Sequence, residues 1–130
     1  MKLRLKGNSI RVRMDRKDLA ELLGCGRTID VVRFGPGPSR TFTYAVKLGT
    51  APQNRPRAEY IAGHLLVILD RGDAETWFSG DQVGLEHWQL LEDGSAIRVI
   101  LEKDFACLDR PAGDESEDAW AFPNPSVASC

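Results

Sequence analysis

The side chains with the clearest chemical potential are cations at the start of the chain. Between residues 2 and 14 they alternate with apolar side chains, and the cations are Lys2, Arg4, Lys6, Arg11 and Arg13. A period of two is typical of a strand pair with one buried face, so the opposite face would be cationic. Such a face can neutralise DNA phosphates, and an arginine can pair bidentately with guanine. The alternative is a solvated strand face whose charges prevent edge-to-edge pairing.

Residues suited to catalysis or metal binding are few and scattered. His64 and His87 are the only histidines, and no motif joins either to a serine or cysteine. The GPGPS stretch at 35–39 lacks the Gly-Lys-Ser/Thr of a phosphate-binding loop, so we interpret it as a turn. No C-x-x-C pair is present. We therefore predict no enzymatic activity, no cofactor and no metal site.

Composition and charge limit the classes of protein to which the chain can belong. With 130 residues, 42% hydrophobic and 28% charged, the chain is long enough for one globular domain. No apolar run approaches the roughly 20 residues of a membrane helix, and no apolar segment follows the basic start as in a secretory signal. The three cysteines, Cys25, Cys107 and Cys130, are odd in number and far apart. This usage favours a reducing compartment, so we expect a cytoplasmic protein without membrane contact.

The net charge of −2 conceals a division between the two halves. Residues 1–57 hold 13 Lys/Arg and 4 Asp/Glu, whereas residues 58–130 hold 4 and 15. Such asymmetry indicates either a polyanionic partner or complementary halves that pair within the fold or between molecules.

The elements expected to position the cations are short strands around a helix. Gly7-Asn8 is a turn between two strands, where Asn8 could adopt a positive φ or reach a base. Asp15 is a suitable N-cap for a helix that ends at Gly24 or Gly26. Further strands are expected over 29–34 and 41–48, followed by a connector at 49–57.

The second half repeats this pattern at a constant offset of 55 residues. Val12, Asp15, Arg16 and Asp18 align with Val67, Asp70, Arg71 and Asp73 as identities. The sequence therefore predicts a β-rich α+β fold in which two fused ββαββ repeats, 2–48 and 57–103, form one small barrel. This pseudo-dimeric, swapped-hairpin barrel would be a single domain over 1–105. An extended, acidic, proline-containing tail would follow at 106–130.

The tail carries a possible anchor for a protein partner. Carboxylates cluster directly before two aromatic residues, and the expected partner-binding residues are Asp114, Glu115, Glu117, Asp118, Trp120 and Phe122. Charge would steer and the aromatics would anchor on a basic protein with an apolar pocket. The alternatives are that the tail shields the chain's own basic hairpin, or that its aromatics fold back onto the barrel.

The segment KGNSIRVRMDRKDLAELLGCG resembles the swapped-hairpin proteins of the AbrB and MazE class, and SGDQVGLE and EDGSAIRVIL carry the complementary part of their pattern. Together these segments cover residues 2–103, although the family often has a proline where Asp15 stands. From KGNSIRVR through EKDFACL to FPNP, the whole chain also resembles a group of small uncharacterised bacterial proteins, which implies no activity.

The AbrB/MazE resemblance implies transcription regulators that bind duplex DNA through the basic hairpin. Matching positions are Lys6, Asn8, Ser9, Arg11 and Arg13, and the charge pattern adds Lys2, Arg4, Arg16 and Lys17. We expect a DNA-binding monomer or homodimer. The alternative is a protein-interaction module, antitoxin-like or structural, that acts through the acidic aromatic tail without binding DNA.

Overall fold

A computed structural model describes residues 1–106 and 120–123. Its elements in chain order are β1 (Lys2–Lys6), β2 (Ser9–Met14), α1 (Arg16–Cys25), β3 (Arg27–Arg33), η1 (Pro38–Arg40), β4 (Thr41–Leu48), β5 (Arg57–Ile61), β6 (His64–Leu69), α2 (Arg71–Ser79), β7 (Gly84–Leu90) and β8 (Ala96–Lys103). This is a β-rich α+β fold, as the sequence predicts.

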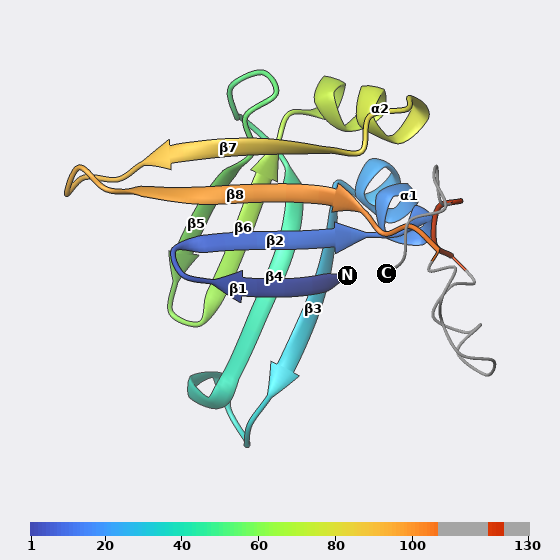
Figure 1. The fold of residues 1–130 in the computed structure, drawn as a ribbon. Helices are drawn as coiled ribbons and strands as arrows, with labels where there is room; N and C mark the ends of the chain where they lie inside the picture. The colour runs from blue at the N-terminus through green and yellow to red at the C-terminus, as the bar shows by residue number, and fades with distance from the viewer. Residues whose placement is uncertain (107–119, 124–130) are drawn as a thin grey trace.

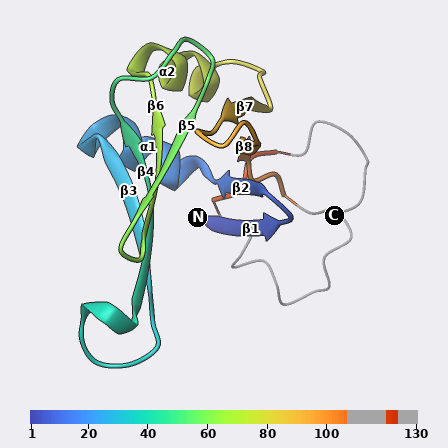
Figure 2. The ribbon, with the colours of Figure 1, turned by 90° about the vertical axis from the view of Figure 1, so that its left-hand side faces the viewer.

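The strands form two four-stranded sheets rather than one barrel. Sheet A has the order β1-β2-β8-β7 and sheet B has the order β3-β4-β6-β5. Figure 1 shows sheet A running across sheet B, with α1 and α2 together at one end. Figure 2 shows the hairpin of β3 and β4 extending past the region that sheet A covers. The predicted closed barrel is therefore wrong.

The sheets stay open because side chains, not a backbone ladder, join their edges. Gln89 on β7 accepts a hydrogen bond from the Ala58 N–H of β5 (2.7 Å) and donates one to the Ala58 carbonyl (3.0 Å). Gln89 thus occupies the backbone groups that β7 would need for strand pairing. At the opposite corner, the amine of Met1 donates to Asp30 of β3 at 3.2 Å.

Each sheet contains strands from both halves of the chain. β2 pairs in parallel with β8, and β4 pairs in parallel with β6. Ser9 lies opposite Arg98 and His64 lies opposite Thr43, so each pair has its counterpart 55 residues away. The expected repeat offset is thus also the offset between the registers of the two sheets.

The core lies between the sheets and under the helices. Alternation along β2 buries Ile10, Val12 and Met14, and Trp77 of α2 is fully buried with them. The capping box of α1 matches the sequence, since Asp15 accepts from the Asp18 N–H and Asp18 accepts from the Asp15 N–H, both at 2.9 Å. These contacts fix the inward face of β2 and so turn its remaining side chains outward.

Candidate nucleic-acid interface

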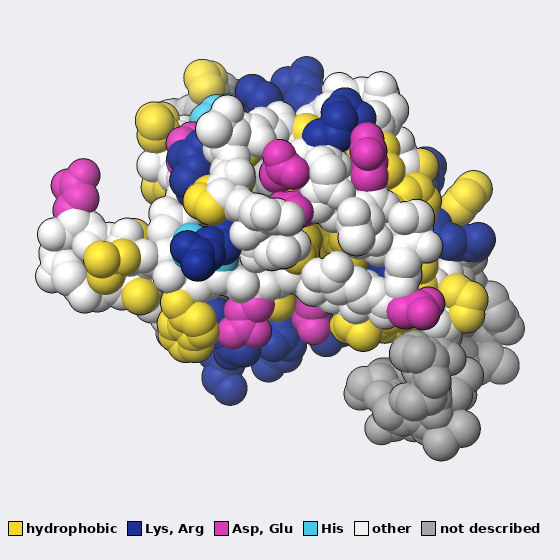
Figure 3. Space-filling model, turned by 90° about the horizontal axis from the view of Figure 1, so that it is seen from above, with side chains coloured by type: hydrophobic (Ala, Val, Ile, Leu, Met, Phe, Trp, Pro, Cys, Tyr) yellow, Lys and Arg dark blue, Asp and Glu magenta, His cyan; other side chains and the backbone are white. Residues whose placement is uncertain are grey.

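The outward side chains of sheet A form three rows across its four strands. The register places Lys2, Arg13, Glu102 and Gly84 in the first row, Arg4, Arg11, Ile100 and Glu86 in the second, and Lys6, Ser9, Arg98 and Trp88 in the third. We call this surface the basic face, defined by its six cations Lys2, Arg4, Lys6, Arg11, Arg13 and Arg98. In Figure 3, Lys and Arg side chains project with acidic ones along the lower margin, the side that carries sheet A.

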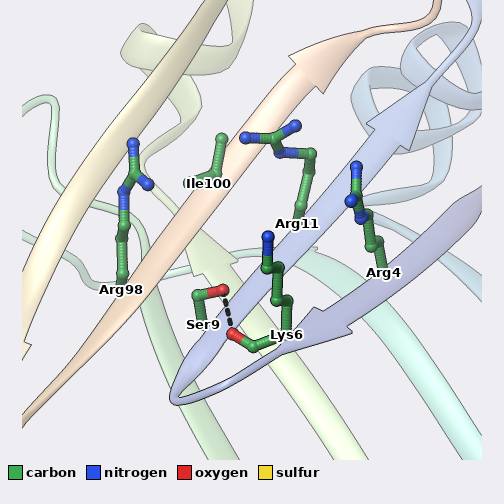
Figure 4. A pocket seen from close by; sticks show the side chains of 6 residues that line it. All are labelled: Arg4, Lys6, Ser9, Arg11, Arg98 and Ile100. Atoms are coloured by element: carbon green, nitrogen blue, oxygen red, sulfur yellow. Dashed lines mark hydrogen bonds between the residues drawn. The ribbon is translucent and has the colours of Figure 1, made fainter.

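A hollow of about 300 Å³ opens in this face between β1, β2 and β8. Its lining residues are Arg4, Lys6, Ser9, Arg11, Arg98 and Ile100 (Figure 4). Ile100 is 6% exposed, so the hollow has an apolar floor beneath charged walls. Three guanidinium groups and one ammonium group around one hollow suit an anion with several oxygens, such as a phosphate.

Carboxylates neutralise part of the basic face. Glu102 lies 3.1 Å from Arg11 Nε and 3.8 Å from Arg13 Nε. Lys2 Nζ lies 3.0 Å from Asp104. Arg4 and Lys6 are exposed, and neither has an ion pair to any acid within the described residues. The unneutralised charge therefore lies at the β1 side of the hollow.

The third row holds an ordered cluster that includes an aromatic ring. Arg98 Nε donates to Glu86 at 2.7 Å, and its guanidinium lies 5.3 Å from the centre of the Trp88 ring. The hydrogen bond from Arg98 lowers the pKa of Glu86 below its ordinary value. Glu86 therefore holds the Arg98 guanidinium beside the Trp88 ring.

A comparison with protein families assigns the chain to one of them. Its residues 1–126 match a family of unknown function, DUF7009. The chain belongs to the DUF7009 family. No curated protein and no solved structure gives a significant match. Because the family match spans both sheets, the two halves of this DUF7009 chain belong to one family unit.

The hairpin tip has a structural role in this family member. Asn8 donates to the Ala96 carbonyl of β8 at 2.8 Å, and the Ser9 hydroxyl donates to the Lys6 carbonyl at 2.6 Å. The positive φ of the turn belongs to Gly7 at 55°, so the expectation of this conformation for Asn8 was wrong. The amide of Asn8 instead ties the tip to sheet A.

Arg16 and Lys17 lie outside the hollow, beyond the end of β2. The Arg16 N–H donates to the Trp120 carbonyl at 2.9 Å, and Lys17 Nζ lies 5.9 Å from the centre of the Trp120 ring. The structure thus assembles Arg4, Lys6, Ser9 and Arg11 around one site but places the two helix residues next to the C-terminal segment.

Sequence reasoning missed the contribution of the second half to this face. Arg98, Glu102, Glu86 and Trp88 all reach it from β8 and β7. Their period-two placement on two strands was a visible signal. Their neighbourhood with the first hairpin was not, because it depends on the parallel pairing of β2 with β8.

The aromatic residues of the tail have different environments. Phe122 is 7% exposed and packs edge-on against Phe78 and Phe105, with centroid distances of 6.3 and 6.1 Å. Its backbone bridges to Phe105, so it belongs to the core and is unavailable as an exposed anchor. Trp120 is 52% exposed. The predicted partner residues Asp114, Glu115, Glu117 and Asp118 lie outside the described residues.

The histidines and cysteines form no candidate metal centre in the described part of the chain. His87 Nδ1 lies 3.1 Å from the Pro56 carbonyl oxygen, and His64 is exposed on β6. Cys25 is exposed, and Cys107 and Cys130 lie outside the described ranges. No helix described here is long and apolar enough to span a membrane.

Proposed function

We propose that the chain is a non-enzymatic, cytoplasmic DNA-binding protein whose basic face contacts the phosphate backbone. The hollow between Arg4, Lys6, Arg11 and Arg98 is the observation that carries this proposal. The face holds six cations, and three acids pair with them, so it keeps an excess of positive charge that attracts a polyanion even with its internal ion pairs intact. Arg4 and Lys6 can bind phosphate without first losing a carboxylate.

We also infer that the chain is an internal duplication of a ββαββ unit related to the AbrB and MazE class. The shared offset of the two registers supports this inference. So does the exchange of hairpins, since each hairpin pairs with the last strand of the other half. A role in transcription regulation would follow from the resemblance, with the regulatory DNA contacts confined to sheet A.

The dependence of DNA binding on salt tests the proposal. The logarithm of the association constant should fall linearly with the logarithm of salt concentration, by about 0.9 per neutralised phosphate on a duplex. Replacing Arg4 and Lys6 together by alanine should weaken binding and reduce that slope by about 2. Fluorescence anisotropy of a labelled oligonucleotide measures both.

A matched control removes two exposed cations from the other sheet. Arg27 and Lys47 lie opposite each other on the outer side of sheet B, and their double alanine variant changes the net charge equally. It should keep nearly the original slope. Equal losses in both double variants, or no binding by the intact chain at low salt, would contradict the proposal.

An interaction module is the second candidate, favoured by exposed apolar side chains on and beside sheet B. Phe34 is 77% exposed, Ile61 74%, Tyr60 65%, and Val31 46%. Such side chains could bury area against a protein or a second copy of the chain. Sedimentation that shows a dimer lost on Ile61→Asp, without any DNA binding, would favour this candidate.

A further inference from the structure

The width of sheet A restricts how the basic face can meet nucleic acid. β2 is paired with β1 along Ser9–Arg13 on one side and with β8 along Ser9–Met14 on the other. At about 4.8 Å between neighbours, four strands span about 14 Å before side chains are counted. The major groove is about 12 Å wide and admits a helix or a two-stranded ribbon. The basic face is too broad to enter it.

The hairpin tip is not free to enter a groove alone. Asn8 binds the Ala96 carbonyl at 2.8 Å, which fastens the turn of the first hairpin to the neighbouring strand. Arg4 and Arg11 lie in the second row of the sheet, and Arg11 sits between β1 and β8. A duplex can therefore rest across this face on its phosphates, but its base edges remain out of reach of these arginines.

Trp88 supplies a contact that a duplex cannot use. It lies on β7 in the row of Lys6, Ser9 and Arg98, and it is 63% exposed. Arg98 covers one side of the ring at 5.3 Å and is itself held by Glu86. Because the ring remains so exposed with that side covered, its other side is open to solvent. An oriented, open indole beside a cationic hollow has the properties of a base-stacking platform.

Arg98 connects this platform to the phosphate site. Its side chain both lines the hollow and lies over the Trp88 ring. β2 and β7 are two strand spacings apart, or about 10 Å. Neighbouring parts of one flexible strand can therefore occupy the hollow and the ring together. A base held in a duplex stack has no free face for Trp88.

We propose that the basic face binds single-stranded nucleic acid, with a backbone phosphate in the hollow and an unpaired base stacked on the open side of Trp88. This inference rests on the proposed function and specifies its substrate class. The stacking contact tolerates any base, so the face would select strandedness rather than sequence.

Anisotropy titrations of the full chain with three labelled probes test the inference. The probes are a 12-nucleotide dT strand, an rU strand of the same length and a 12-base-pair duplex of mixed sequence. The single strands should bind more tightly than the duplex at the same salt concentration. Trp88→Ala should weaken single-strand binding about tenfold, leave the duplex affinity within about twofold, and keep the salt slope, because no charge is removed. Trp88→Phe should recover part of the loss.

Leu90→Ala is the matched control. Leu90 is 76% exposed on the same strand and lies on the same side of the sheet two residues beyond Trp88, but it has no ring. This variant should bind all three probes like the intact chain, and circular dichroism should show that each variant is folded.

Equal effects of Trp88→Ala on duplex and single strands would overturn this inference and leave the proposed function standing. Loss of self-association in Trp88→Ala, with unchanged nucleic-acid binding, would assign the ring to a protein contact. Failure of every probe to bind at low salt would overturn both proposals.

Discussion

At the scale of single residues, internal carboxylates of the basic face would compete with a bound phosphate for the same guanidinium groups. Glu102 is the centre of this competition, since it faces both Arg11 and Arg13. The oxygen that faces both guanidinium groups, Oε1, is buried, and its ion pairs lack the geometry of a hydrogen bond. Under the proposed function, a phosphate that binds Arg11 must compete with this carboxylate, so we expect Glu102 to lower the affinity of the basic face.

Glu102→Gln should therefore tighten nucleic-acid binding by about fivefold, or about 1 kcal/mol, because one competing charge near the site is removed. Anisotropy at fixed low salt measures the change. Glu59→Gln is the control, since Glu59 pairs with Arg57 on sheet B and should alter binding less. An unchanged or weaker affinity in Glu102→Gln would show that ordering Arg11 matters more than freeing it.

The carboxyl of Glu86 offers a second test at this scale. Its pKa is lowered chiefly by the hydrogen bond from Arg98, so Arg98→Ala should return the pKa towards its ordinary value. A carboxyl whose pKa is depressed by folding stabilises the protein above its unfolded-state pKa, and this contribution is lost as the pH falls through the folded-state value. Carbon-detected NMR titration of Glu86 in the intact chain and in Arg98→Ala measures the direction in which the pKa changes. An unmoved pKa would show that Arg98 does not hold the carboxylate in solution.

At the scale of elements, the two helices use the same starting sequence differently. Each helix starts with two aspartates three residues apart, Asp15 and Asp18 in α1 and Asp70 and Asp73 in α2. In both helices the first aspartate is the N-cap, and its side chain accepts a hydrogen bond from the backbone N–H of the second. Asp18 completes a capping box with Asp15, whereas Asp73 turns to accept from the Asn54 N–H of the connector at 2.6 Å. Asp73 of α2 is thus hydrogen-bonded to the connector and does not complete a capping box. At the start of α1, the Arg16 N–H instead donates to the Trp120 carbonyl of the C-terminal segment at 120–123.

Docking of this segment predicts unequal effects of its two aromatic residues. Phe122→Ala should lower the free energy of unfolding by about 3 kcal/mol, because a buried ring that contacts Phe78 and Phe105 is removed. Trp120→Ala should cost less than about 1 kcal/mol, since that ring is half exposed. Urea denaturation followed by circular dichroism compares the two. Equally small losses would mean that Phe122 does not remain docked.

At the scale of the whole molecule, the halves are interlocked. The central strand pairs β2–β8 and β4–β6 each join one half to the other, so neither half contains a complete sheet. A unit of this size also buries too little apolar surface to be stable alone. Folding therefore depends on both halves together.

Expression of residues 1–54 and 55–130 as separate chains tests this dependence. Each fragment alone should lack a cooperative unfolding transition, and an equimolar mixture should regain the sheet signal in far-ultraviolet circular dichroism. The break lies in the connector after Leu48 and before β5, so it removes no strand pairing. Cooperative unfolding of residues 1–54 alone would contradict the interlocked arrangement.

The local elements of the fold follow from the amino-acid sequence alone. Alternation predicted strands 2–6, 9–14 and 41–48, which match β1, β2 and β4, and Asp15 located the start of α1. These features follow from periodicity and capping, which act over a few residues. The 55-residue offset was also visible, and the registers of the two sheets have it.

Whether the sheets close into a barrel, and which residues share the candidate site, depend on long-range packing. Gln89 meets β5 through its side chain and leaves two sheets where a barrel was expected. Parallel pairing brings Arg98, Glu102, Glu86 and Trp88 beside the first hairpin, and packing buries Phe122 while it leaves Trp120 half exposed. Such contacts join residues far apart in the chain, and the energies that select them depend on the packed whole rather than on any local pattern.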